Sequence, residues 1–269
     1  MQSKIEHAKN IINEYKRVIV AFSGGVDSLY LLNLAVQTLG KENILAATVK
    51  SPLSTVGEAE NAQYLSNNLG VNHIIVELDE LSESKIVNNP IDRCYHCKKF
   101  RYEHLVKLKD GRKYGAVLDG SNFSDLGDYR PGMRACEELG IISPLKQSEF
   151  TKDEIRQQLK SLAIPQWDTP SRACLASRIP YGDILTGEKL SIVDNSERFL
   201  MSLGFRDLRV RVHGDIARIE LPKRDMSVIF ERDLTQVIFK ELKKYGFKFV
   251  TLDLEGLRSG SLNPDIEPG

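Results

Sequence analysis

An apolar run that leads directly into a glycine-rich turn is the feature that most constrains this chain. Residues 17–28 read RVIVAFSGGVDS, and a helix-like segment follows them. Because Gly24 and Gly25 have no Cβ, the turn can adopt positive φ and bring backbone N–H groups close to an anion. Ser23 and Ser28 add hydroxyl donors, and the positive end of the helix dipole faces the same anion. The segment predicts a binding site for the phosphates of a nucleotide.

This turn is not a Walker-type loop, because it lacks the lysine of the G-x-x-x-x-G-K-[ST] pattern. The usual kinase and GTPase arrangement therefore does not apply. S-G-G-V-D-S instead resembles the PP-loop of the ATP pyrophosphatase superfamily. That resemblance implies cleavage of ATP between the α and β phosphates and activation of a substrate oxygen as an adenylate. The alternative is an ordinary strand-to-helix turn. The apolar strand before the motif and the helix after it favour the PP-loop interpretation, because they are the structural context that this motif requires.

The composition is that of a soluble globular protein with one large or two modest domains. The chain has 269 residues, of which 41% are hydrophobic. Its 37 basic residues balance 37 acidic ones, so no overall field favours nucleic acid or an anionic membrane. No apolar run reaches the ~18 residues of a membrane span, and the N-terminus lacks the apolar core of a signal peptide. We expect a cytoplasmic protein with no membrane partner.

Strand-like and helix-like segments alternate in the first part of the chain. The strand-like runs cover residues 18–22, 44–49, 74–78 and 116–118, with helix-like stretches such as 57–69 and 98–108 between them. This alternation predicts an α/β fold with a parallel sheet covered by helices on both faces. A ligand is then expected at the carboxyl ends of the strands, where the glycine-rich turn and the segment 119–122 also fall. Residues 151–154 read TKDE, which has the form of a capping box and predicts the start of a helix that reaches about residue 162.

A proline-rich connection over residues 164–182 separates this part from a second pattern, and connections of such length are usually functional or disordered. The second pattern predicts a helix over 187–203, strands over 208–212 and 216–221, an amphipathic helix over 225–245 and a strand over 247–252. We therefore expect a PP-loop ATP pyrophosphatase domain at residues 1–180, a small α+β domain for substrate binding or oligomerisation at 181–258, and a flexible tail at 259–269.

Four cysteines are too few for a disulfide scaffold in a chain of this length. Cys94 and Cys97 form a C-x-x-C pair, and Cys174 lies between two arginines in the proline-rich connection. If that connection folds over the sheet edge, the three sulfur atoms converge. Spacing alone leaves three alternatives: a 4Fe-4S cluster, a zinc site completed by His96, or three partly buried apolar side chains. Cys136 is expected on a helix face.

The hairpin of the second unit carries an unusual set of charges. Arg209 and Arg211 are two apart on one predicted strand and share a face, and Arg218 and Glu220 lie across the hairpin from them. From the residues alone, these charges are either a solvent-exposed face or an anion site.

Taken together, these segments resemble the LarE family of ATP-dependent sulfurtransferases, which make the nickel-pincer nucleotide cofactor. The supporting stretches are AFSGGVDS at 21–28, VLDG at 117–120, DYRPG at 128–132, SRIPYG at 177–182, RVR at 209–211, DIARIEL at 215–221 and VTLDL at 250–254. The resemblance implies adenylation of a carboxylate of pyridinium-3,5-biscarboxylic acid mononucleotide, release of pyrophosphate and replacement of the activated oxygen by sulfur.

The resemblance also implies roles for individual residues. The expected ATP-binding residues are Ser23, Gly24, Gly25, Asp27 and Ser28. The expected substrate-binding residues are Arg130, Arg178, Arg209, Arg211 and Glu220. Magnesium would neutralise the departing pyrophosphate, with Asp27 as a candidate ligand.

Cys174 matches the position that gives up its own sulfur in one branch of the family and ends as dehydroalanine. That branch lacks paired cysteines at the positions of Cys94 and Cys97. Chains with all three cysteines resemble the cluster-dependent branch, so we expect a [4Fe-4S] cluster on Cys94, Cys97 and Cys174. Sacrificial transfer from Cys174 without a cluster stays as the alternative.

Three other functions compete with this one. A PP-loop tRNA thiolation enzyme is disfavoured by the neutral net charge and the lack of an evident basic tract. An amidating PP-loop synthetase would need a glutaminase segment, which is not evident. A non-catalytic ATP-binding redox sensor would use Cys94 and Cys97 as a reversible disulfide. We further expect a sulfide donor as a partner and a homo-oligomer.

Overall fold

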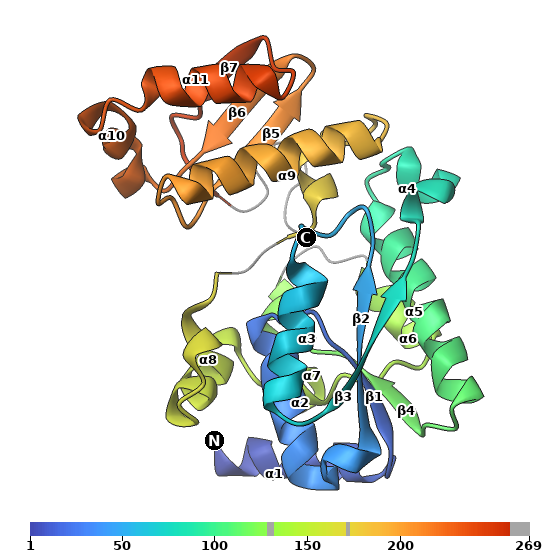
Figure 1. Ribbon diagram of the computed structural model, residues 1–269. Helices are drawn as coiled ribbons and strands as arrows, with labels where there is room; N and C mark the ends of the chain where they lie inside the picture. Colours follow the sequence, from blue (N-terminus) through green and yellow to red (C-terminus); the bar gives the residue numbers. More distant parts are fainter. Residues whose placement is uncertain (128–131, 171–172, 259–269) are drawn as a thin grey trace.

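The computed structural model describes residues 1–127, 132–170 and 173–258. Its first unit is built on a four-stranded parallel sheet with the order β3-β2-β1-β4 (Figure 1). The strands are β1 (Val18–Ala21), β2 (Ile44–Lys50), β3 (Asn72–Glu77) and β4 (Ala116–Leu118). The predicted α/β fold with a parallel sheet is confirmed.

Helices pack on both faces of this sheet because its strands are apolar on both sides. Val18 and Val20 contribute to one core, together with side chains of α1 (Gln2–Asn13), α2 (Val26–Leu39), α3 (Glu58–Asn68) and α8 (Lys152–Ser161). Ile19 points to the opposite face and joins the core against α5 (Arg93–Gly111) and α6 (Gly132–Glu138). The alternation of side chains along β1 thus places the PP-loop between two helical layers.

The remaining elements of the first unit are short. They are α4 (Ser84–Val87), α7 (Pro144–Gln147), η1 (Lys41–Asn43), η2 (Glu80–Ser82), η3 (Phe123–Gly127), η4 (Pro165–Asp168) and η5 (Leu175–Arg178). The predicted capping box is present: the Thr151 side chain accepts from Glu154 N, and the Glu154 side chain accepts from Thr151 N.

The second unit contains the small sheet β5-β6-β7. Strands β5 (Arg209–His213) and β6 (Ile216–Glu220) form the predicted antiparallel hairpin, and β7 (Phe249–Leu252) pairs parallel to β6. Helix α9 (Gly187–Ser202) precedes the hairpin. The single helix expected over residues 225–245 is wrong: the structure has α10 (Lys223–Glu231) and α11 (Thr235–Lys244), separated at Asp233, whose φ is +50°. Aspartate tolerates this left-handed conformation better than most residues, and it ends the first helix.

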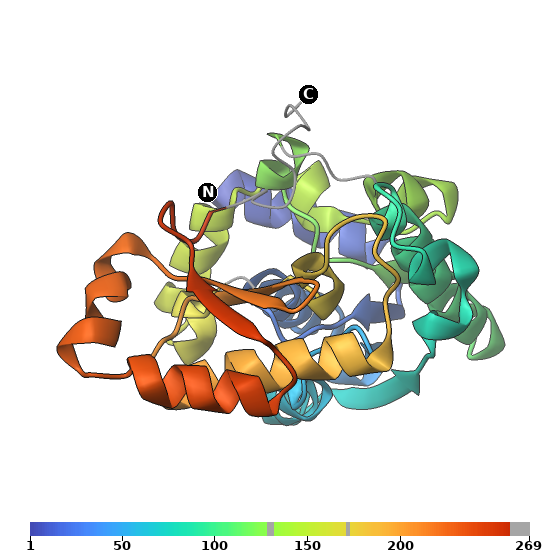
Figure 2. The same ribbon diagram turned by 90° about the horizontal axis from the view of Figure 1, so that it is seen from above.

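The second unit lies beyond the carboxyl ends of the strands of the first, and partly over them in the view from above (Figures 1 and 2). Leu53 and Ile86 of the first unit share a buried core with η5, α9 and the small sheet. The proline-rich connection has only short 3₁₀ helices in its described part, as expected. The boundaries at residues 180 and 258 stay predictions, and the expected tail lies outside the described residues. Within the described parts of the chain, no helix has the length and apolarity needed to cross a bilayer.

Candidate active site

The PP-loop joins β1 to α2 and is held open by its own hydroxyl groups. Gly24 has a φ of +73°, which favours glycine. The Ser28 hydroxyl donates to Gly25 O at 3.0 Å and lies 3.2 Å from the Ser23 hydroxyl, while Gly25 N donates to Ser23 Oγ at 3.3 Å. The loop and the N-terminus of a 14-residue helix therefore form one preorganised anion site.

A second loop packs directly against this site. Asp119 and Gly120 follow β4, and a Cβ on Gly120 would lie only 2.9 Å from Ser28 N. Glycine is therefore required for the β4 end to approach the first turn of α2 this closely. The expectation that the 119–122 segment ends at the same sheet edge as the PP-loop is confirmed.

The two carboxylate oxygens of Asp27 differ in their contacts. Its Oδ2 accepts a hydrogen bond from Lys152 Nζ, while its Oδ1 is buried and has no hydrogen-bond partner among the residues that the structure describes. A buried carboxylate oxygen without a partner is costly, and hard oxygen ligands suit Mg²⁺. The residue present therefore fits the magnesium expected at this loop.

Lys152 was missed by sequence reasoning. It is the first residue of α8, and its own N–H donates to Ser124 Oγ at 3.1 Å. The capping box predicted where α8 begins, but no local pattern indicates that this end of the helix reaches Asp27, which lies 125 positions earlier in the chain.

Asp119 is the centre of a buried polar network. Lys98 Nζ lies 3.1 Å from its Oδ2, and the hydroxyls of Ser121 and Ser143 donate to it at 2.7 and 2.5 Å. Burial opposes ionisation of Asp119, but the charge of Lys98 and these hydrogen bonds outweigh it and lower the pKa of the carboxyl group. Since Lys98 directly follows Cys97, the network links the C-x-x-C helix to the sheet edge.

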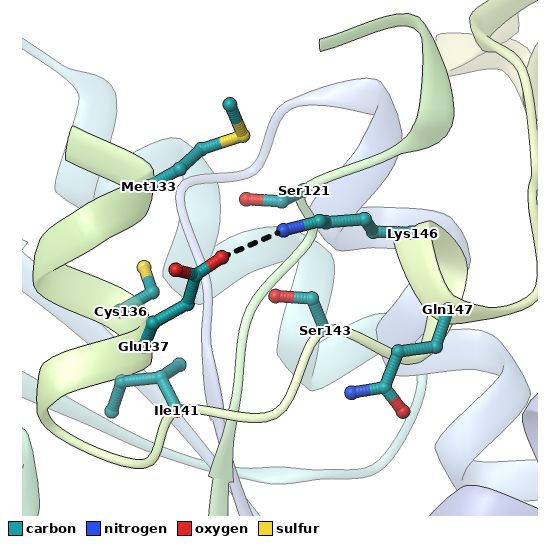
Figure 3. A pocket seen from close by; sticks show the side chains of 8 residues that line it. All are labelled: Ser121, Met133, Cys136, Glu137, Ile141, Ser143, Lys146 and Gln147. Atoms are coloured by element: carbon teal, nitrogen blue, oxygen red, sulfur yellow. Dashed lines mark hydrogen bonds and ion pairs between the residues drawn. The ribbon is translucent and has the colours of Figure 1, made fainter. Parts of the chain in front are cut away.

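A cavity of about 150 Å³ lies beside this network (Figure 3). Its lining residues are Ser121, Met133, Cys136, Glu137, Ile141, Ser143, Lys146 and Gln147. Lys146 and Glu137 form an ion pair of 3.2 Å within the lining. Cys136 lies on the helix α6, as predicted, and it is buried. Burial raises the pKa of its thiol to about 12.

The three predicted sulfur ligands lie in one region at the junction of the two units. Cys94 and Cys97 are on the first turn of α5, and Cys174 is the N-cap residue of η5. Burial raises the pKa of Cys97 well above its ordinary value; Arg101 opposes this, and the charges of Glu80 and Cys174 add to it. The Cys97 thiol donates to Glu80 at 2.9 Å.

Arg93 lies near the thiols of Cys94 and Cys174. Burial lowers the pKa of its guanidinium. The charges of Cys174 and Cys94 raise this pKa by more than burial lowers it, so the net shift is upward. Its Nη2 lies 3.7 Å from Cys94 Sγ. Cys174 is therefore within electrostatic reach of both Arg93 and Cys97.

The donor chemistry at this junction fits a thiolate-held group, because three thiols are accompanied by two buried or half-buried arginines, Arg93 and Arg101. Over residues 1–127, 132–170 and 173–258, however, no group of three or more His, Cys, Asp or Glu side chains is already arranged to hold a metal ion. His96, the fourth ligand of the zinc alternative, instead pairs with Asp92 at 3.2 Å.

Two of the predicted substrate arginines, Arg178 and Arg211, are buried, and Arg209 is half-buried. Arg178 is 1% exposed and makes two hydrogen bonds, of 2.9 and 3.0 Å, to the carboxylate of Glu197. Arg211 makes the same kind of paired contact with the fully buried Glu220, at 3.1 and 2.9 Å. Such bidentate contacts fix the plane of each guanidinium.

Glu197 was also missed, although the sequence carries a signal for it. It occupies the apolar stripe of α9, between Val193 and Leu200, where a carboxylate must have a buried partner.

Arg209 is close to buried charges of both signs. Burial and the neighbouring charge of Arg178 lower its pKa to about 10, with Glu197 and Glu220 opposing and Arg211 contributing. A cation whose charged form is disfavoured by other cations gains from an added anion. Arg130, the remaining predicted substrate residue, lies outside the described residues.

A parallel sheet with a lysine-free PP-loop at its carboxyl edge defines an ATP-using enzyme of the PP-loop ATP pyrophosphatase class. Residues 3–98 match the model of the NAD synthase family. Over 258 residues the chain is 40% identical to a pyridinium-3,5-bisthiocarboxylic acid mononucleotide synthase of Lactiplantibacillus plantarum, covering 95% of this chain and 92% of that protein. The chain therefore belongs to the LarE family of ATP-dependent sulfurtransferases.

Two uncharacterised proteins share the same full-length similarity. One from Synechocystis is 39% identical, with 98% of each chain covered. One from Methanocaldococcus jannaschii is 33% identical, covering 95% of this chain and 98% of the other. The family assignment thus applies to both units of the chain, not to the PP-loop alone.

Proposed function

We propose that this protein converts a carboxylate of pyridinium-3,5-biscarboxylic acid mononucleotide into a thiocarboxylate at the expense of ATP. The observation that carries the proposal is the 40% identity, over nearly the whole chain, to the pyridinium-3,5-bisthiocarboxylic acid mononucleotide synthase. The PP-loop, the cysteines and the buried arginines supply the parts that such a reaction needs.

The first step makes a leaving group. Direct replacement of a carboxylate oxygen would expel oxide, so the carboxylate oxygen first attacks the α-phosphorus of ATP. The bond from that phosphorus to the oxygen bridging to the β-phosphate breaks, pyrophosphate departs with the electron pair, and an acyl adenylate remains. Ser23, Gly24, Gly25 and Ser28 bind the phosphates through backbone N–H groups and hydroxyls. Magnesium, bound to Asp27, would neutralise the pyrophosphate as it leaves.

The arginines of the second unit hold the substrate. Arg209, flanked by Arg178 and Arg211, offers positive charge to the phosphate or a carboxylate of the mononucleotide. Glu197 and Glu220 keep Arg178 and Arg211 in fixed orientations. Arg178 also donates to the carbonyl oxygen of Cys174 at 2.9 Å, which connects the substrate region to the sulfur region.

The second step adds sulfur. A sulfur nucleophile attacks the carbonyl carbon of the acyl adenylate, the bond from that carbon to the AMP oxygen breaks, and AMP leaves with the electron pair. Cys94, Cys97 and Cys174 would hold a [4Fe-4S] cluster that supplies this sulfur, replenished by a sulfide donor. The gathering of the three thiols near Arg93 and Arg101 supports this, and sacrificial transfer from Cys174 is the alternative. We also propose that the protein works as a homo-oligomer.

The reaction is tested by product analysis under anaerobic conditions. Enzyme, Mg·ATP, sulfide and the biscarboxylic acid mononucleotide should yield AMP, pyrophosphate and a thiocarboxylate product in equal amounts, measured by chromatography and mass spectrometry. ADP and orthophosphate as products, or AMP formation independent of the mononucleotide, would overturn the proposal.

A further inference from the structure

Two buried side chains attach the segment that carries Cys174 to the helix that carries Cys94 and Cys97. Arg93 is 2% exposed, and Asn89 is fully buried. Arg93 Nη1 donates to Ala176 O at 3.0 Å and also to Asn89 Oδ1. Ala176 is two residues after Cys174, so the contact fixes the backbone next to that thiol.

Asn89 holds the other end of the same segment. Its Nδ2 donates to Pro180 O at 2.6 Å and to Ile179 O at 3.2 Å, and its carbonyl oxygen accepts from Gly182 N at 2.9 Å. Its φ is +49°, a left-handed conformation that asparagine adopts more readily than most residues. All these contacts cross about 90 positions of sequence, so none of them is a local turn.

Arg93 also reaches the C-x-x-C pair. Its Nη2 is 3.7 Å from Cys94 Sγ, while Nη1 is bonded to the Cys174 segment. One guanidinium, fixed in its plane by several acceptors, thus bridges the two parts of the chain that carry the thiols. The second unit contacts the same segment through a hydrogen bond from Arg211 Nη1 to Ser177 O.

We propose that Asn89 and Arg93 form a clasp that sets the position of Cys174 relative to Cys94 and Cys97. Both are positioning residues: they act on the reaction through the backbone of the Cys174 segment. The inference rests on the proposed role of Cys174 in sulfur delivery, and it applies both to a cluster and to direct transfer from Cys174.

The test uses the proximity of the thiols in the reduced, metal-free full-length protein. Dibromobimane becomes fluorescent only after it alkylates two neighbouring thiols, each of which displaces one bromide. Peptide mapping then gives the ratio of Cys174-containing cross-links to the Cys94–Cys97 cross-link. We compare wild type with Asn89→Gly, which keeps the left-handed backbone but removes the amide, and with Arg93→Lys, which keeps the charge but loses the bridging geometry.

Arg156→Lys is the matched control. Arg156 donates to Trp167 O at 2.6 Å and to Thr169 O at 2.8 Å, so it holds the same connection upstream of the cysteine. The clasp predicts a ratio at least about tenfold lower in Asn89→Gly and Arg93→Lys than in wild type, because about 1.4 kcal/mol of lost positioning corresponds to tenfold. The ratio in Arg156→Lys should equal that of wild type.

An unchanged ratio in both clasp variants, an equal fall in Arg156→Lys, or the absence of Cys174 cross-links in wild type would overturn the clasp. Melting temperatures identify a variant that fails to fold, and the other clasp variant then decides. A clasp-dependent ratio in a protein that makes no thiocarboxylate would leave the clasp standing and refute the proposed function. Normal product formation with an unchanged cross-link ratio would refute the clasp and leave the proposed function standing.

Discussion

At the scale of single residues, Lys152 supplies a cation that the PP-loop itself lacks. It donates a hydrogen bond to Asp27 Oδ2, while Asp27 Oδ1 is buried and has no hydrogen-bond partner within the described parts of the chain. We expect Mg·ATP to bring a cation for Asp27 and phosphates for Lys152, so that the pair separates and both groups gain new partners. Lys152 is then expected to contact the phosphates that leave as pyrophosphate.

Lys152→Met should therefore lower the affinity for ATP about tenfold and leave the affinity for AMP unchanged, since the lost contact is charge-assisted and involves the β or γ phosphate. Isothermal titration with a non-hydrolysable ATP analogue and with AMP measures both. Lys4→Met is the control. Lys4 forms an ion pair of 2.9 Å with Glu154, which lies in the same first turn of α8 as Lys152, and this ion pair does not include a PP-loop residue. An equal loss for both nucleotides would contradict this role.

The sequence separation between a residue and its partner explains which residues could be predicted from the sequence and which could not. Ser23 and Ser28 were predicted because the whole phosphate loop is contiguous in the chain. Lys152 was missed because its partner is 125 positions away, and nothing near it indicates the contact. Glu197 falls between these cases: its place in an apolar helix stripe requires a buried cation, but the stripe does not say which one.

Among the elements, the end of β4 and the start of α2 approach each other closely beside the PP-loop, where we expect ATP to bind. Gly120 permits this approach, because a Cβ there would meet Ser28 N at 2.9 Å. Strand and helix positions were predictable from the periodicity of apolar residues. This contact instead depends on the twist of the sheet and on the register of its strands, which the periodicity does not give. The break between α10 and α11 was missed for a related reason: the amphipathic pattern continues through Asp233, and only the left-handed backbone ends it.

Gly120→Ala should lower both the melting temperature and the affinity for ATP. The added methyl forces the β4 end away from α2, at a cost of about 1–3 kcal/mol for overpacking. Gly111→Ala serves as the comparison, since its Cβ would meet nothing within 4 Å and its helical position favours alanine by about 0.5–1 kcal/mol. Thermal melts with and without ATP analogue measure both effects. An ATP-dependent stabilisation in Gly120→Ala equal to that of wild type would contradict the account.

In the molecule as a whole, the two units meet around one connecting segment. The segment over η5 is attached to the first unit through Leu53, Asn89 and Arg93, and to the second through Glu197 and Arg211. Periodicity predicted both sheets, and the prolines predicted an irregular connection between them. The buried ion pairs that fasten this connection could not be predicted, because charge pairing between distant segments leaves no periodic signal.

We propose that Cys94, Cys97 and Cys174 act together in sulfur delivery. The most direct measurement is the iron and acid-labile sulfide content after strictly anaerobic reconstitution, for wild type and for Cys94→Ala, Cys97→Ala and Cys174→Ala. Cys136→Ala is the matched control, because this fourth cysteine is buried on α6 beside Asp119. We expect about four irons per chain in wild type and in Cys136→Ala, and their loss in each of the other variants. Wild-type protein without iron, or iron fully retained in Cys174→Ala, would contradict it.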